Sequence, residues 1–105
     1  MTKVGKWYPL AERLSRWSRI RLLKVVLKNH TQIDIAKSCG VTRQAVFNWL
    51  TKDAYHPNDE NASTLLRLAW QVDKKRVREI LRAEAKRYLS ELRRIGIVFR
   101  SKQGC

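Results

Sequence analysis

Apolar residues recur every three or four positions over residues 9–28, which is the spacing of an amphipathic helix. Pro9 suits the first turn of a helix, where its missing N–H costs nothing. The apolar stripe consists of Leu10, Leu14, Trp17, Ile20, Leu23 and Leu27. The positions between them carry the cations Arg13, Arg16, Arg19, Lys24 and Lys28. The spacing predicts one long helix, whose cations lie either on a solvated face or against phosphates.

Residues 32–51 show the same helical spacing in two short segments around Gly40. A left-handed backbone at this turn is cheap only for glycine. Ala36 falls where the two helices pass closest, so a larger side chain would separate them. The apolar core positions are Ile35, Cys39, Val41, Val46 and Trp49. The spacing predicts two short crossed helices joined by a tight turn, a helix-turn-helix unit.

Both helices of this unit have capping residues at their starts. Thr31, with Asp34 three residues later, forms a capping box for the first helix. Thr42 can cap the second, because its hydroxyl can accept from an N–H that has no partner inside the helix. The starts, the turn and the core therefore agree in register.

The remaining residues predict a loop and two further helices. Residues 52–61 are rich in turn formers, and Asn61 can cap a helix over residues 62–72. Asp73 then caps a longer helix or continues the previous one with a bend. The first of these helices has the apolar residues Leu65, Leu66, Leu68 and Ala69. The second has Val77, Ile80, Leu81, Tyr88, Leu92 and Ile95.

The last helix is expected to stop at Gly96, before a brief apolar run at residues 97–99. Glu79, Glu84 and Glu91 each stand three residues before an arginine, a spacing that stabilises a helix by a few tenths of a kcal/mol per pair.

The chain of 105 residues is expected to form one domain. We expect an all-α fold of about five helices, in which residues 9–72 form a helix-turn-helix core and residues 73–99 add a long basic C-terminal helix and tail. No hydrophobic run is long enough to cross a bilayer, and Met1 to Tyr8 form a short basic arm that lacks the apolar core of a signal peptide. A cytoplasmic protein without a membrane partner is expected.

The net charge of +14 indicates a polyanionic partner. Residues 1–30 hold eight lysines and arginines against one acid, and residues 73–105 hold eleven against four, so each flank carries +7. Residues 31–72 hold four against four and are neutral. We expect the flanks to supply most of the attraction to phosphates and the helix-turn-helix unit to select the binding site.

Catalytic and metal chemistry have little support in the sequence. Cys39 occupies a helix core position, Cys105 is the last residue, and His30 and His56 are isolated, which is not the spacing of a metal site. The acids are dispersed, and neither a glycine-rich phosphate loop nor a nucleophile motif is present. We expect no metal, cofactor, small-molecule effector, disulfide or enzymatic activity.

Residues 31–72, about two-fifths of the chain, resemble the lambda-repressor and Cro type of helix-turn-helix DNA-binding domain. The matching segments are Thr31-Gln32, Ile35-Ala36, Gly40 to Val46, Asn48-Trp49, Leu65-Leu66 and Leu68-Ala69. The later leucines extend the match beyond a helix pair to a further helix. The loop at residues 50–60 is longer than usual for the family, and the flanks are more basic than is typical. The resemblance implies binding of double-stranded DNA.

The resemblance also implies that the second helix of the unit, residues 42–51, enters the major groove while the first crosses the backbone. Arg43 would then form two hydrogen bonds with guanine, and Gln44 would do the same with adenine. Asn48, one turn after Gln44, is the next candidate for contact with a base. Phe47 either touches a thymine methyl group or packs under the long loop.

A second group of residues suits the phosphate backbone. Gln32 and Thr42 lie at helix starts, where side chains and backbone N–H groups can act together on an anion. Lys52 comes directly after the reading helix. The full set of expected phosphate-binding residues is Thr31, Gln32, Thr42, Lys52, Lys6, Arg13 and Arg16.

The C-terminal helix has two interpretations. Homodimerisation would bury its apolar side and would place two reading helices about one DNA turn apart, favouring an inverted-repeat site. Alternatively the helix packs within its own chain and its cations run along neighbouring phosphates. We favour the homodimer because exposed apolar surface is costly.

The expected function is that of a nucleoid-associated, sequence-specific transcriptional regulator, a repressor that occupies a promoter. A DNA-binding or architectural accessory protein of a partition, recombination or replication system would use the same residues. Non-specific coating of DNA or RNA is encouraged by the net charge. Binding of the basic C-terminal helix to a membrane surface is a further alternative, which the helix-turn-helix motif disfavours.

Overall fold

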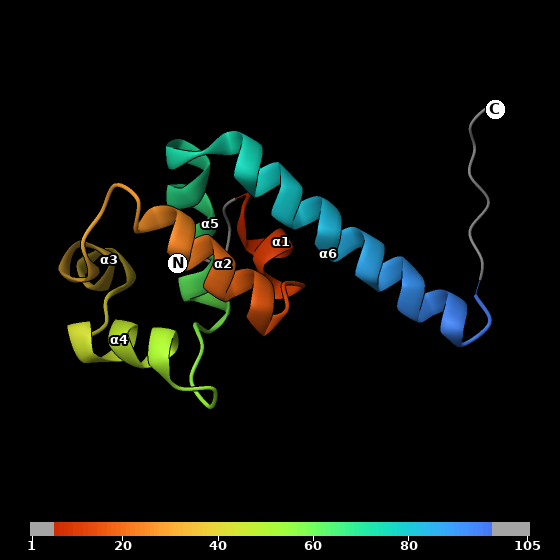
Figure 1. Cartoon of the computed structure of the whole chain (residues 1–105), viewed down its shortest axis with the longest axis horizontal. Helices are drawn as coiled ribbons and strands as arrows, with labels where there is room; N and C mark the ends of the chain where they lie inside the picture. Colours follow the sequence, from red (N-terminus) through yellow and green to blue (C-terminus); the bar gives the residue numbers. More distant parts are fainter. Residues whose placement is uncertain (1–5, 98–105) are drawn as a thin grey trace.

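The computed structural model describes residues 6–97, which form six α-helices and no strand (Figure 1). The helices are α1 (Tyr8–Glu12), α2 (Arg16–Val26), α3 (Gln32–Cys39), α4 (Arg43–Thr51), α5 (Asp59–Val72) and α6 (Lys74–Arg94). The expected all-α fold is confirmed, with one helix more than the sequence indicated. Residues 1–5 of the expected basic arm, and Val98 and Phe99 of the terminal apolar run, lie outside the described residues.

The single helix expected over residues 9–28 is wrong, because the chain breaks between α1 and α2. Ser15 has an extended backbone, and its hydroxyl accepts from the N–H of Ser18 (3.2 Å), so it caps a new helix. The break rotates the apolar face: Leu10 and Trp17 are 43% and 69% exposed. The residues that the two helices bury are Ala11, Ser18, Arg19, Leu22, Leu23, Val25 and Val26.

Helix α5 lies at the centre of the fold and packs against α1, α2, α3 and α6. The largest buried side chains of the core are Leu22, Leu23, Ile35, Leu65, Leu66 and Ile80. Of the core positions expected in the helix-turn-helix unit, Ile35, Val46 and Trp49 are buried, and Cys39 and Val41 pack half-buried against them. The apolar spacing of residues 32–51 therefore predicted the packing of α3 and α4 correctly.

The capping box and the glycine turn of this unit are also confirmed. The Thr31 hydroxyl accepts from the N–H of Asp34 (3.1 Å), and the Asp34 carboxylate accepts from the N–H of Thr31 (3.2 Å). Gly40 has a φ of +69°, and the next N–H, from Val41, donates to the carbonyl of Ala36 (2.9 Å). This Schellman arrangement ends α3 and aims the chain into α4.

Helix α5 begins earlier than its expected start at Ala62, because Asn58 rather than Asn61 caps it. The Asn58 side chain accepts from the N–H of Asn61 (2.8 Å), and the acids Asp59 and Glu60 occupy the first turn, where the helix dipole favours negative charge. The expected loop is correspondingly shorter.

Asp73 separates α5 from α6, as expected for a cap. Its carboxylate accepts from the N–H of Arg76 (3.0 Å) and from the ammonium group of Lys28 (3.0 Å). The backbone N–H of Arg76, followed by the Lys28 side chain, holds the pKa of Asp73 below its ordinary value. The junction between the two helices is therefore tied to the end of α2.

Arg19 is buried, at 7% exposure, and the expectation that it lies on a solvated or phosphate-binding face is wrong. Its guanidinium donates to the carbonyls of Leu14 (3.0 Å), Pro57 (2.9 Å) and Ala11 (3.1 Å). It also pairs with Asp59 (2.8 Å). The planar fork of five N–H donors suits this role, because one side chain satisfies carbonyls from the α1–α2 connection and the loop before α5.

Only the first part of α6 belongs to the core. Val77 and Ile80 are buried, whereas Tyr88 is 57% exposed and Ile95 is 71% exposed. Figure 1 shows α6 packing beside α2 and α5 and then running out beyond the other helices. The apolar stripe expected along this helix therefore has two parts, one packed within the chain and one open.

Glu84 connects α6 to the start of α2. Its Oε1 accepts from the Ser15 hydroxyl (2.9 Å) and from the Ser18 hydroxyl, and its Oε2 pairs with Arg87 one turn later. Burial raises the pKa of Glu84, but the hydrogen bonds from Ser18, Arg87 and Ser15 outweigh it and hold the pKa below its ordinary value. The carboxylate form is thus the one that the fold stabilises.

Replacing Glu84 by glutamine is expected to lower the free energy of unfolding by about 1–2 kcal/mol near neutral pH, the cost of weakening charge-assisted hydrogen bonds. Because the folded-state pKa is lowered, this contribution is present above about pH 4.5, the ordinary glutamate pKa, and is lost as the pH falls further. Urea unfolding at a series of pH values measures the difference. The exposed Glu79, replaced by glutamine, should change stability little at any pH; an equal effect of the two substitutions would contradict the assignment.

Candidate nucleic-acid interface

Helix α4 buries one side and exposes the other. Val46 and Trp49 lie in the core, whereas Arg43, Gln44 and Phe47 are exposed. Phe47 is 43% exposed, so the loop after α4 does not bury it. The structure thus brings these expected base-contacting residues together on the open side of one short helix.

Asn48 joins this face through a hydrogen bond with Gln44. The Gln44 Nε2 group donates to the Asn48 Oδ1 atom at 3.0 Å. The bond leaves the Gln44 carbonyl oxygen and the Asn48 NH2 group as an acceptor and a donor side by side. Adenine presents the complementary donor and acceptor, N6–H and N7, in the major groove. The two amides can therefore act as one unit toward a base.

The starts of α3 and α4 carry the expected phosphate-binding residues Thr31, Gln32 and Thr42. The Thr42 hydroxyl accepts from the N–H of Ala45 (3.1 Å), as the Thr31 hydroxyl does at α3, and each hydroxyl keeps its own hydrogen for an outside acceptor. The amide oxygen of Gln32 is buried without a hydrogen-bond partner. The NH2 group is then the end of this side chain that can donate to a phosphate. These starts also present N–H groups for which the helix has no acceptor.

A shallow groove of about 230 Å³ lies between α2 and the end of α4. It brings the expected phosphate-binding residues Arg16 and Lys52 together with Lys24. Arg16 also pairs with Asp53 at 3.4 Å, where both side chains are well exposed and the interaction is weak. Two cations of the N-terminal flank, Arg16 and Lys24, therefore lie beside α4, although residues 31–72 are formally neutral.

The groove is also lined by Trp17 and Lys24, which the sequence did not place in the set of expected phosphate-binding residues. Trp17 was expected in the core, but its side chain is 69% exposed. Ser15 was the signal in the sequence that could have indicated the exposure of Trp17. A serine that caps a new helix places residue 17 in the first turn of that helix.

Lys6 and Arg13, also expected at phosphates, lie elsewhere. The Lys6 ammonium stands 4.9 Å from the ring centroid of Trp7, and Trp7 packs on Trp70 with centroids 5.5 Å apart. Arg78 of α6 approaches the same Trp70 ring at 5.3 Å. Arg13 lines a groove between α1 and α6. The structure does not bring these two cations together with the exposed residues of α4.

Cys39 is held as a neutral thiol. Burial raises the pKa of its thiol to about 11, and the nearby Arg67 lowers it only in part. Over residues 6–97, no three His, Cys, Asp or Glu side chains are grouped so as to hold a metal ion.

Comparison with models of known protein families, with curated proteins and with solved structures gave no match. None of the helices in the described part of the chain is both long and apolar enough to cross a bilayer.

Proposed function

We propose that this protein is a sequence-specific double-stranded DNA-binding regulator, acting as a repressor at the nucleoid in the cytoplasm. The observation that carries the proposal is the open side of α4, where Arg43, Gln44 and Asn48 can reach base edges while the other side of the helix is locked in the core. A helix of this kind fits the major groove and offers the hydrogen-bond donors and acceptors that distinguish base pairs.

The charge distribution supports a division of labour. Arg16, Lys24 and Lys52 line the groove beside α4, so the N-terminal flank can bind phosphates next to the bases that α4 contacts. Within residues 6–97, α6 packs against α2 and α5, and Figure 1 shows the end of α6 lying away from α3 and α4. In this proposal α6 therefore serves mainly to pair two chains, which would present two reading helices to an inverted repeat.

An accessory DNA-binding protein of a partition, recombination or replication system is the second candidate, because it would use the same residues. The location of bound sites separates the two: an isolated site near a promoter supports a regulator, and long tiled footprints support an architectural role.

The proposal is tested by selecting bound duplexes from a random pool at two salt concentrations. We expect a short shared sequence with two-fold symmetry, recovered at both concentrations, because contacts with base edges add a preference that counterion release does not erase. Retention of duplexes without any shared sequence would contradict sequence-specific regulation and favour non-specific coating.

A further inference from the structure

One face of α2 carries an exposed tryptophan beside two cations. Trp17, Arg21 and Lys24 are four and three residues apart, the spacing at which side chains share one face of a helix. All three are exposed, Trp17 at 69%, whereas the residues on the other side of α2 lie in the core. The indole ring offers a large apolar face and one N–H donor, a combination that is enriched at interfaces. This face of α2 is therefore a candidate binding surface.

The charge of this face is not balanced within the described residues. Helix α2 contains no acid. The ion pairs among residues 6–97 include neither Arg21 nor Lys24, and the cation–π contacts in the same range do not include Trp17. Asp53, the acid of the groove between α2 and α4, pairs with Arg16 (3.4 Å). Over this range the ring and the two cations are therefore open to an outside partner.

Trp17 adjoins the exposed side of α4. The groove of about 230 Å³ between the two helices is lined by Trp17 and Lys24 from α2 and by Thr51 and Lys52 from the end of α4. The Thr51 hydroxyl donates to the carbonyl of Phe47 (2.8 Å), one turn earlier on the exposed side of α4. The groove beside Trp17 thus begins where the expected base-contacting residues end.

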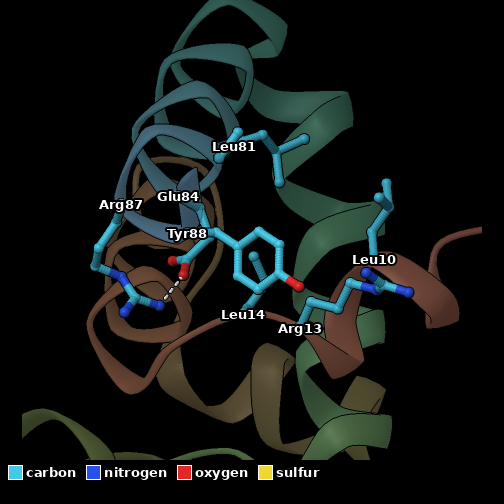
Figure 2. Close-up of a pocket in the computed structure, with 8 residues that line it drawn as sticks. Leu10, Arg13, Leu14, Leu81, Glu84, Arg87 and Tyr88 are labelled. Atoms are coloured by element: carbon cyan, nitrogen blue, oxygen red, sulfur yellow. Dashed lines mark hydrogen bonds and ion pairs between the residues drawn. The ribbon is translucent and has the colours of Figure 1, made fainter. Parts of the chain in front are cut away.

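Trp17 also borders a second hollow, of about 340 Å³, between the start of α2 and α6. Arg21 lines this hollow together with Glu84 and Arg87. Figure 2 shows the Arg87 guanidinium turned to the Glu84 carboxylate, with which it pairs, so these two charges balance each other. Arg21 is the cation of this hollow that can bind an anion. The basic surface therefore continues from the end of α4 past Trp17 to Arg21.

We propose that Trp17 contacts the sugar–phosphate backbone of DNA: its indole ring packs on a deoxyribose of the strand whose phosphates bind Lys24 and Lys52, and its Nε1–H donates to a phosphate. Arg21 binds a further phosphate of that strand. In a duplex the faces of the bases are covered by neighbouring bases, whereas the sugars line the outside of each strand. A ring held among phosphate-binding cations therefore meets sugars, and such contacts fix the register of a protein on DNA.

The chemistry around Trp17 favours DNA over a second copy of the chain or a lipid surface. A second copy has the same net charge of +14 and the same cations on this face, so like charges would meet. A helix bound to a membrane places its apolar side in the lipid, but the apolar side of α2 lies in the core. Phosphates supply the complementary charge, and the surface is continuous with the side of α4 that is proposed to contact bases.

This inference deepens the proposed function by adding a backbone contact to the same interface, and it rests on that function for the DNA itself. The two fail differently. If the wild-type chain binds no duplex, the proposed function fails and the inference fails with it. If the wild-type chain selects a sequence and Trp17→Ala binds as tightly, only the inference fails.

The first test measures dissociation constants by fluorescence anisotropy for the selected duplex and for a duplex with altered bases. We expect Trp17→Ala to weaken both by about tenfold, the effect of losing about 60 Å² of buried apolar surface, and to keep their ratio. Trp17→Phe keeps a ring and should recover most of the loss. Leu89→Ala removes an exposed apolar side chain of α6 and should change neither constant. Equal losses in the Trp17→Ala and Leu89→Ala chains would overturn the proposal.

The second test locates the contact by hydroxyl-radical cleavage, which attacks exposed deoxyriboses, with each protein at a concentration that saturates the selected duplex. We expect the wild-type chain to protect a sugar at the edge of the site that Trp17→Ala leaves open. Arg21→Ala should keep that protection and reduce the slope of log K against log salt by about 1. Identical cleavage with the wild-type and Trp17→Ala chains would overturn the proposal. Tighter, Trp17-dependent binding to a single strand of the same sequence would also overturn it, because it would indicate stacking on an unpaired base.

Discussion

Replacing Arg19 by methionine is expected to lower the free energy of unfolding by about 3–5 kcal/mol. Methionine keeps the apolar stem but removes the guanidinium donors from the carbonyls of Leu14, Ala11 and Pro57. The Ala11 carbonyl keeps the N–H of Leu14 (3.1 Å), so the main cost falls on the other two carbonyls and on Asp59, which loses its ion pair. Each buried acceptor left unpaired costs about 1–3 kcal/mol, and the costs are not fully additive. A small domain has only about 5–15 kcal/mol in total, so this substitution should remove much of its stability. Urea unfolding followed by circular dichroism measures it.

Two variants control for charge and for helix propensity. Arg19→Lys keeps the charge but should recover little of the loss, because one ammonium group cannot reach three carbonyls and Asp59 together. Arg21→Met, on the exposed side of the same helix, should change stability by less than about 0.5 kcal/mol. Equal unfolding midpoints for the Arg19→Met and wild-type proteins would show that Arg19 does not hold α1, α2 and the loop together.

Joint replacement of Arg43 and Gln44 by alanine is expected to reduce discrimination between the preferred duplex and one with altered bases by about 100-fold. The two side chains lie at the exposed start of α4, and each bidentate contact with a base accounts for about 1–3 kcal/mol of discrimination. Neither residue is buried, so the fold should remain intact. Fluorescence anisotropy with two labelled duplexes measures the ratio of dissociation constants.

The matched control removes two cations from the neighbouring groove. Lys24→Ala with Lys52→Ala should weaken binding to every duplex, reduce the slope of log K against log salt by about 2, and keep the base preference. If the Arg43 and Gln44 variant instead weakens all duplexes equally and keeps its preference, α4 does not select the bases.

Local signals were sufficient to predict the helix-turn-helix unit from the sequence. The capping box at Thr31, the left-handed Gly40 and the buried Ile35 and Val46 all depend on neighbours a few residues away. Such short-range hydrogen bonds and helical spacing are encoded within one or two turns of chain. The positions of the expected base-contacting residues on the open side of α4 followed from the same spacing.

The parts that depend on distant contacts could not be predicted in this way. Arg19 resembles any other cation of an amphipathic helix, and only Pro57, 38 residues later, reveals why it is buried. The break at Ser15 was hidden because Leu14 and Ile20 continue the helical spacing across it. A capping serine inside an apolar stripe competes with the stripe, and here the cap prevailed.

The apolar stripe of α6 shows a different limit. Spacing alone does not distinguish Val77, which packs on the core, from Ile95, which the described part of the chain leaves open. The point at which a helix extends beyond the globular core depends on the lengths of the helices that pack beside it. The same holds for the groove between α2 and α4, because its cations come from segments that are far apart in the sequence.

In the proposed function α4 selects bases while the basic residues beside it supply attraction to phosphates. The most direct test compares two dissociation constants, one for the selected duplex and one for a duplex of the same length with altered bases. Their ratio is measured at two salt concentrations. We expect both constants to rise steeply with salt while their ratio stays at about 1,000 or more. A ratio near one at both salt concentrations would contradict the claim.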